Sequence, residues 1–176
     1  GFDFTMQDKL EAVKLAVGLG AIKVPPPKPP ESEARPKGRL HSLRRDSESI
    51  QHHYDVSNDF YRLILGPTMV YSCAYFHSAD DSLEEAQTRK LDMDCETQRL
   101  EPGERLLDIG CGWGSMAIHA ASNYGVKVVG VTLSIAQAER ARQRVAEAGL
   151  EDRIEIRIQD YREVSDGPFD KLCSIG

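Results

Sequence analysis

The sequence has few cysteines, no long apolar run and no excess of positive charge. Its four cysteines form no CxxC pair and are too sparse for a disulfide framework, so we expect a reducing compartment and no metal site. No apolar run approaches the roughly 18 to 20 residues of a membrane-spanning helix, and no leader pattern follows Gly1, so we expect neither a spanning helix nor a secretion signal. The formal net charge of −6 gives a nucleic acid no overall electrostatic footprint, and we expect no nucleic-acid partner.

Prolines divide the chain into two modules. Six of the nine prolines lie between Pro25 and Pro36, and because proline fixes φ and removes an amide donor, this stretch should be an extended linker. The prediction therefore has four parts. They are a helical segment over residues 1–24, a proline-rich and then basic linker over 25–46, a second helical segment over 47–102, and an α/β domain over 103–176.

Two features near the N-terminus leave their roles open. Leu10, Val13 and Val17 recur at helical spacing, which predicts a short amphipathic helix that packs against protein or lies on a membrane surface. Residues 35–45 hold five cations and no acid. This tract either meets an anionic surface or is a solvated end of the linker.

Four apolar or β-branched runs after Gly103 predict strands, at residues 106–109, 126–133, 154–158 and 169–175. Helical patterns separate the first three runs. Strands that alternate with helices predict an α/β fold with a doubly wound parallel sheet, right-handed crossovers and helices on both faces. The sequence stops directly after the fourth strand, which would leave an apolar edge uncovered, so we expect a fragment of a longer protein.

Two helices of the α/β domain have clear limits. The first carries buried-face residues from Met116 to Ala121 and ends at Gly125. The second opens with a capping box formed by Ser134 and Gln137 and ends at Gly149.

A glycine-rich turn joins the first strand to the first of these helices. Residues 108–114 read DIGCGWG, with glycine at every second position from Gly110. Glycine permits positive φ and close approach of a ligand to the backbone, and a helix start offers amide donors and a positive dipole end. The turn therefore suits a ligand with a carboxylate or phosphate. As an alternative, it only shapes a tight corner between strand and helix.

Two residues argue against a dinucleotide in this turn. Dinucleotide-binding folds carry GxGxxG and an acid about 20 residues later, whereas this chain has GxGxG and Thr132. Asp108 would repel a pyrophosphate but attract an ammonium group. A ligand with both an amine and a carboxylate fits, and S-adenosylmethionine is such a ligand.

Asp160 and Tyr161 follow the third strand, at the edge where open α/β sheets bind ligands. The carboxylate could accept a hydrogen bond from an adenine amino group, and the aromatic ring could cover the base. Both could equally be ordinary exposed loop residues.

Four sequence blocks resemble the cyclopropane fatty acid synthase family, which includes the mycolic acid cyclopropane synthases. They are HYDVSNDFY at 53–61, YSCAYF at 71–76, LLDIGCGWGS at 106–115 and VTLSIAQ at 131–137. The resemblance covers about Ser47 to Gly176. It implies a class I, Rossmann-like fold that uses S-adenosylmethionine to alkylate the double bond of an unsaturated acyl chain, with residues 47–102 on the substrate side.

The resemblance also implies a set of cofactor contacts. Residues 71 and 72 should touch the methionine portion, the glycine turn should wrap it, the end of the second strand should meet the ribose, and residues 160 and 161 should hold the adenine. The expected cofactor residues are Tyr71, Ser72, Leu107, Asp108, Gly110, Cys111, Gly112, Trp113, Gly114, Thr132, Leu133, Ser134, Gln137, Asp160 and Tyr161.

For catalysis, the family uses a bicarbonate ion as base. Cys73 matches a position that lines the bicarbonate site through its backbone, and the other ligands are expected beyond Gly176. The alkene attacks the sulfonium methyl and a carbocation forms, which aromatic faces suit. Tyr75 is a candidate shelter, with Tyr71, Phe76 and Trp113, although each could be a packing aromatic. Proton loss gives a cyclopropane ring or a methylene group that a partner reductase converts to a methyl branch.

The family implies phospholipid acyl chains as substrate and a cytoplasmic enzyme, peripheral at the inner face of the membrane; the oligomeric state stays open. We expect the 176-residue piece alone to be inactive. Two alternatives remain: a methyltransferase for another small acceptor, and a non-catalytic lipid-binding module.

Adjacent His52 and His53 invite a metal or base assignment, but neighbouring side chains point in different directions. Asp55, Asn58 and Asp59 are expected to cap a helix.

Overall fold

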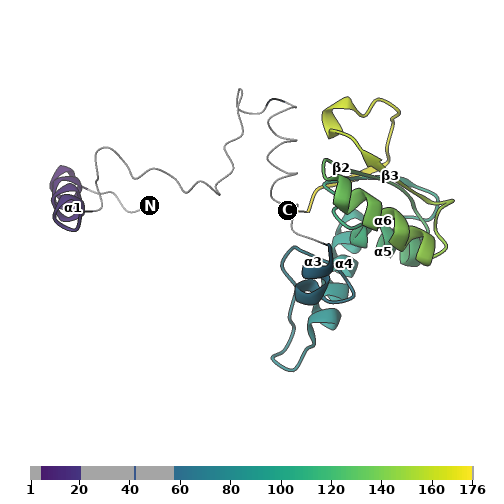
Figure 1. The fold of residues 1–176 in the computed structure, drawn as a ribbon, viewed down its shortest axis with the longest axis horizontal. Coiled ribbons are helices and arrows are strands. Elements are labelled where there is room, and N and C mark those ends of the chain that lie inside the picture. The colour runs from purple at the N-terminus through teal and green to yellow at the C-terminus, as the bar shows by residue number, and fades with distance from the viewer. Residues whose placement is uncertain (1–4, 21–41, 43–57, 176) are drawn as a thin grey trace. The chain divides into compact units, whose positions relative to one another are not determined.

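The computed structural model describes residues 5–20, 42 and 58–175 (Figure 1). The chain forms two compact units, residues 1–35 and 36–176. The expected proline-rich linker, the basic tract, apart from Ser42, and the adjacent histidines lie outside the described residues. No helix among the described residues is long and apolar enough to cross a membrane.

Helix α1, Met6–Gly18, is the expected N-terminal helix. Thr5 caps it, and a capping box joins the Thr5 and Asp8 side chains to each other's backbone amides. None of its residues is buried. The packing expected for its apolar positions is therefore not seen in the part of the chain that the structure describes.

The second unit is built on a four-stranded sheet, entirely parallel, in the order β3-β2-β1-β4. Its strands are β1 Arg105–Ile109, β2 Lys127–Thr132, β3 Ile154–Ile158 and β4 Lys171–Cys173. The predicted parallel sheet is confirmed. The fourth strand is shorter than predicted because only residues 171–173 pair with β1, while Asp170 bonds to Arg105 just before the ladder.

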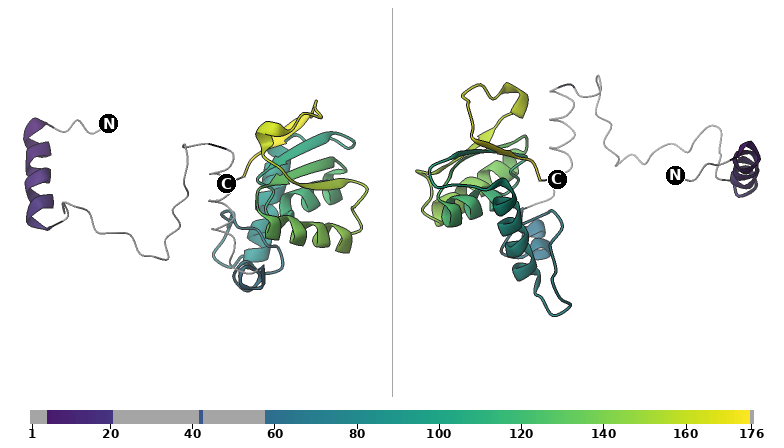
Figure 2. Two further views of the ribbon diagram at one scale, coloured as in Figure 1. Left: turned by 45° about the horizontal axis from the view of Figure 1, so that its top comes forward. Right: turned by 180° about the vertical axis from the view of Figure 1, so that it is seen from behind.

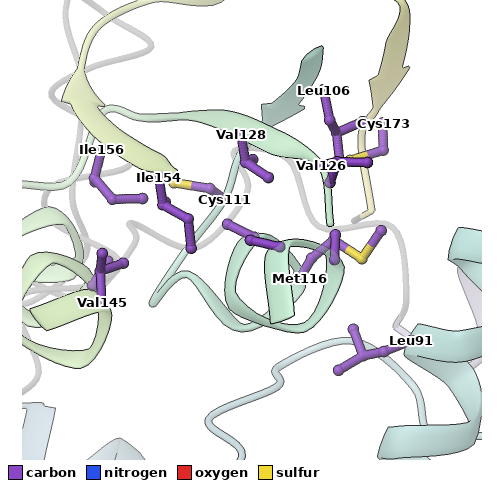
Figure 3. Close-up of a cluster of buried hydrophobic side chains, with 14 of the residues drawn as sticks. Leu91, Leu106, Cys111, Met116, Val126, Val128, Val145, Ile154, Ile156 and Cys173 are labelled. Carbon is purple, nitrogen blue, oxygen red and sulfur yellow. The ribbon is translucent and has the colours of Figure 1, made fainter. Parts of the chain in front are cut away.

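The helices of this unit pack on one face of the sheet (Figures 1 and 2). Helix α5, Ser115–Tyr124, and helix α6, Ile135–Glu147, lie against β2 and β3, and helix α4, Leu83–Gln98, packs beside α5. Figure 3 shows the shared core, in which Leu106, Val128 and Ile154 point from the strands toward the helices. Val145 on α6 and Leu91 on α4 meet them there. Burial of this apolar face is the main force that fixes the layers.

The opposite face of the sheet is covered without a long helix among the described residues. Leu107, Val129 and Val131 form a separate buried cluster there, and Val164 and Phe169 are the partly buried residues outside the strands that pack against it. Among the described residues, the connection from β3 to β4, with its short 3-10 helix η1 at Tyr161–Glu163, covers this face. No helix of eight or more residues does so in the described range.

The capping box predicted for α6 forms only in part. Ser134 is the N-cap and accepts from the Gln137 amide, as predicted. The Ser134 amide, however, donates to Thr132 Oγ1, and the Gln137 side chain accepts from the Thr132 hydroxyl instead. Thr132 therefore takes the place that the second half of the box would occupy.

Helix α3, Asn58–Leu65, begins at one of the three residues expected to cap a helix, and another of them, Asp55, lies outside the described residues. Asn58 is the first helical residue, and its side chain joins distant segments. Its Oδ1 accepts from Trp113 Nε1 at 2.8 Å, and its Nδ2 donates to the Ala136 carbonyl at 3.1 Å. Asn58 thus ties α3 to the glycine turn and to the start of α6.

Candidate functional site

One cavity of about 610 Å³ lies at the carboxyl ends of the strands in the second unit. Its walls come from β1 and β2, from the residues that follow β3 and β4, from the glycine turn, from the segment before α4 and from α4 itself. The predicted site residues that line it are Tyr71, Ser72, Asp108, Gly110, Cys111, Gly112, Trp113, Thr132, Leu133, Gln137, Asp160 and Tyr161. Open α/β sheets bind ligands at this edge.

Several predicted site residues do not line this cavity. Leu107 is buried on the other face of the sheet, because neighbouring residues of a strand point to opposite sides. Ser134 is committed to capping α6. Cys73 is exposed, and Tyr75 is half exposed outside the lining.

Close packing requires glycine at two positions, one in the glycine turn and one in the neighbouring strand β2. Gly114, the N-cap of α5, has a φ of +79° and lies against α6, where an added Cβ would come within 3.3 Å of the Ala141 Cβ. Gly130, inside β2, lets the turn lie directly on the strand, since a Cβ there would be 3.0 Å from the Cys111 side chain. The turn is therefore packed tightly between β2 and α6, and the start of α5 opens onto the cavity at Ser115 and Met116.

Asp108 is the most unusual group in the cavity wall. Its side chain is only 2% exposed, and Oδ2 has no hydrogen-bond partner among the described residues. Oδ1 accepts from Cys173 Sγ at 3.5 Å. Burial raises the pKa of Asp108 to about 6, while the Cys173 thiol and the Lys90 charge oppose the rise. A buried carboxylate with an unsatisfied oxygen is a ready acceptor for a cationic ligand group.

Asp160 has the opposite environment. Its Oδ1 accepts from the Arg162 amide and Nε, and its Oδ2 accepts from Arg162 Nη2 at 2.6 Å. The Arg162 guanidinium holds the pKa of Asp160 below its usual range. The carboxylate is therefore already paired, and Tyr161 beside it is exposed.

The end of β2 presents neutral polar groups. Thr132 Oγ1 donates to Gln137 Oε1 at 3.1 Å, which fixes the orientation of the Gln137 amide. The Gln137 Nε2 then lies near Gly112, 4.0 Å from where a Cβ would stand. These groups suit hydroxyls, and they include no carboxylate of the kind that a dinucleotide ribose requires.

Aromatic rings gather where α3 meets the glycine turn. The Tyr61 and Trp113 ring centroids are 4.9 Å apart, and Tyr71 lies 6.0 Å from Tyr61 and 6.5 Å from Trp113. Trp113 and Tyr71 line the cavity. Of the four expected aromatic shelters, these two are at the cavity, and Tyr75 and Phe76 are not among its lining residues.

Buried polar side chains hold the segment before α4 in place. Arg144 on α6 donates to the Thr68 and Trp113 carbonyls at 3.0 and 2.7 Å, and to Ser115 Oγ at 2.9 Å. On the other side, α4 contributes Lys90 and Gln87, which bond to Ser72. The cavity wall at Tyr71 and Ser72 is therefore fixed from both α6 and α4.

Sequence reasoning missed Lys90 and Arg162, which both line the cavity. Lys90 had a detectable signal, because it falls at helical spacing among Ala86, Leu91 and Cys95, which are all buried. A lysine within an apolar stripe is rare unless it is paired. Arg162 had no such sequence signal, since its pairing with Asp160 depends on the η1 turn.

Comparison with known proteins agrees with this geometry. A family model described as mycolic acid cyclopropane synthetase matches residues 41–176. The chain belongs to this family. It is similar to a probable fatty acid methyltransferase of Mycobacterium tuberculosis, with 46% identity over 99% of this chain and 42% of the relative. A cyclopropane-fatty-acyl-phospholipid synthase of Escherichia coli K12 is 50% identical over 78% of this chain and 34% of its own length.

A solved structure matches as well. Mycolic acid cyclopropane synthase CmaA1, complexed with SAH and CTAB, superposes with a TM-score of 0.70 at 43% identity, covering 74% of this chain and 45% of that one. The expected methyltransferase-like, Rossmann-like fold is thereby confirmed. The chain spans less than half of the length of these three relatives.

Proposed function

We propose that the complete gene product that carries this chain transfers a methyl group from S-adenosylmethionine to the double bond of an unsaturated phospholipid acyl chain. The product is a cyclopropane ring or a methylene group that leads to a methyl branch. The observation that carries the proposal is the buried Asp108 Oδ2, which has no partner among the described residues, in a cavity that also contains the glycine turn. Family membership supplies the class of acceptor.

The residues of the cavity fit this cofactor at each of its parts. Asp108 Oδ2 accepts from the ammonium group, and the start of α5 with Ser72 provides donors for the carboxylate. Thr132, Leu133 and Gln137 face the ribose. Tyr161 covers the adenine, and Asp160 reaches its amino group only by sharing oxygens that Arg162 already uses.

The same residues disfavour a dinucleotide. An anionic Asp108 beside the turn repels a pyrophosphate, and Thr132 offers no carboxylate to a ribose diol. Two neutral residues, Thr132 and Gln137, are bonded to each other where that acid would stand. The zwitterionic methionine portion matches both the charge and the polarity of this end.

S-adenosylmethionine, when bound, supplies an electrophilic methyl group. The chain itself orients this donor through Asp108 and the glycine turn. Trp113 and Tyr71 present aromatic surface at the cavity, which excludes water and favours a neighbouring positive charge. Tyr75 and the backbone of Cys73 form part of the acceptor side only together with residues beyond this chain, including those that hold a bicarbonate base.

We also propose where in the cell the enzyme acts. The enzyme acts in the cytoplasm at the inner face of the membrane, where its phospholipid substrate lies, and the basic tract over residues 35–45 contributes to anionic-surface binding. A reductase follows it if the product is a methylene group.

The test is label transfer with the complete gene product. The enzyme is incubated with methyl-labelled S-adenosylmethionine and vesicles that contain oleoyl phospholipid, and the lipids are analysed by mass spectrometry after double-bond-specific derivatisation. We expect label in the acyl chain, and loss of that label with Asp108→Asn. Cofactor binding without any lipid labelling would point to another acceptor, and absence of both would contradict the proposal.

A further inference from the structure

Lys90 is a buried lysine in the cavity wall. It lies on α4 and is 7% exposed. Its Nζ donates to Ser72 Oγ at 2.8 Å and lies 3.8 Å from Asp94 Oδ2, one turn further along the same helix. Lysine is almost never buried to this degree without a function or a partner, because removing an ammonium from water is costly.

Two side chains of α4 hold Ser72, one through its carbonyl and the other through its hydroxyl. Gln87, one turn before Lys90 on α4, donates from Nε2 to the Ser72 carbonyl at 2.9 Å. Gln87 therefore fixes the backbone at this position, and Lys90 fixes the hydroxyl. A neutral amide would be sufficient for position alone, so the charge at position 90 requires a further explanation.

The charge lies among acids that are otherwise short of partners. Asp94 Oδ2 and Asp108 Oδ2 are both buried without a hydrogen-bond partner among the described residues. Asp108 and Lys90 line the same cavity. Lys90 is one cation beside the buried Asp108 and the partly buried Asp94, so acids outnumber this cation and a ligand ammonium group is favoured.

We propose that Lys90 is a positioning residue for the cofactor: it fixes the Ser72 hydroxyl in the cavity wall, and its charge keeps the neighbouring Asp108 in the state that accepts an ammonium group. The inference rests on the proposed function and deepens it, because it gives Lys90, one of the cations that line the cavity, a role at the methionine end of the cofactor. Lys90 acts through Ser72 and Asp108 and takes no part in methyl transfer.

The charge of Lys90 should lower the pKa of Asp108. The groups that face Asp108 are Cys173 on β4, Cys111 in the turn and Lys90 on α4. Both thiols have raised pKa values, chiefly through burial, and stay neutral. Lys90 is therefore the cation that lowers the pKa of Asp108 against the effect of burial. Without it, the carboxyl should remain protonated to a higher pH.

The experiment measures the affinity for S-adenosylhomocysteine by calorimetry between pH 5 and 8.5 on the complete gene product. Lys90→Met should weaken binding about tenfold at pH 8, through loss of a charge-assisted contact. It should also move the acid limb of the affinity profile to higher pH. Lys90→Arg should leave the acid limb at its wild-type position, because arginine keeps the positive charge.

The matched control is Arg89→Met. Arg89 is the neighbouring cation on the same helix, but its partners are Asp81 and the Tyr75 carbonyl, neither of which lines the cavity. The control should leave both the affinity and the acid limb unchanged. A purely structural role for Lys90 would lower affinity without moving the acid limb, and that result would overturn the inference.

A double-mutant cycle with Ser72→Ala covers the case in which Lys90→Met does not fold. The Lys90→Arg and Ser72→Ala changes should be non-additive, because both act on one hydrogen bond. Additive effects would contradict the assigned contact. If the unmodified protein does not bind S-adenosylhomocysteine at all, the proposed function fails; if it binds and the variants behave like Arg89→Met, only this inference fails.

Discussion

The two ends of the cavity each present a buried aspartate, yet the two carboxylates have opposite environments. Asp108 at the end of β1 has an oxygen without a partner among the described residues, and burial raises its pKa to about 6. Asp160, after β3, is enclosed by Arg162, which lowers its pKa. A carboxylate that the fold already neutralises is a structural element. One that the fold leaves uncompensated costs stability and is retained for a ligand.

The largest expected effect comes from removing the Asp108 charge. Asp108→Asn keeps the shape of the side chain but leaves the ligand ammonium without its counter-charge, so affinity for S-adenosylhomocysteine should fall by about 100-fold or more. Calorimetry on the complete gene product measures the loss. Equal loss in Asp160→Asn would remove the distinction between the two ends.

Binding should also depend on pH through the same carboxyl. Because the pKa of Asp108 is raised to about 6, the anionic form is lost as the pH falls through that value. Affinity should then drop about tenfold for each further pH unit. A titration of affinity from pH 8 to 5 follows this limb, and the limb should be absent in Asp108→Asn. A profile without that limb in the unmodified protein would mean that Asp108 does not pair with the ligand.

The free energy of unfolding of the unliganded protein should have the opposite dependence on pH and should fall as the pH rises. The pKa of Asp108 is higher in the folded state, about 6, than its ordinary value of 3.8, so the folded state binds more protons in this window. Its contribution to stability is present below about pH 4 and is lost as the pH rises to about 6, which amounts to about 3 kcal/mol. Denaturant unfolding of the wild-type protein and Asp108→Asn compares the two. The variant should lack this fall.

A smaller effect is expected at the junction between the glycine turn and the segment before α4. Arg144→Met removes the donors to the Thr68 and Trp113 carbonyls, and cofactor affinity should fall about tenfold. Arg142→Met is the control on the same helix, because Arg142 donates only to the Ile156 carbonyl of β3 among the described partners. Both variants should lose stability in thermal unfolding. Only Arg144→Met should lose affinity, and equal losses would contradict a role at the cavity.

The smallest effect should come from Asp160→Asn. This change weakens a partly exposed ion pair with Arg162, whose worth is on the order of 1 kcal/mol or less. Cofactor affinity should fall about threefold. A loss of 100-fold would instead mean that the ligand takes Asp160 from Arg162.

The sequence predicts most of the sheet and its helices because their patterns are local. Met116, Ala117, Ala120 and Ala121, expected on the buried face of α5, are its buried residues. The glycine turn and the acid before it could likewise be predicted from seven consecutive residues, although only the structure shows that Asp108 Oδ2 has no partner among the described residues. Ile158 was less predictable: it continues the alternation of β3, but it is 45% exposed because it lies at the edge of the sheet, past the end of the core.

The remaining features depend on contacts between distant segments. Asn58 looks like a helix cap from its neighbours, but folding places Trp113, 55 residues away, against its side chain. Lys90 reaches Ser72 across 18 residues. The sequence also gives no sign that the β3–β4 connection covers the second face of the sheet in the described range. Tertiary packing decides each of these contacts, and the one local signal among them was the place of Lys90 among buried apolar residues of α4.

The most direct measurement is a crystal structure of the complete gene product with S-adenosylhomocysteine. We predict the adenosyl ligand in the cavity at the carboxyl ends of β1 to β3, with its amino group about 3 Å from Asp108 Oδ2. A ligand whose amino group contacts other residues while Asp108 stays unpaired, or density for a pyrophosphate at the glycine turn, would contradict it.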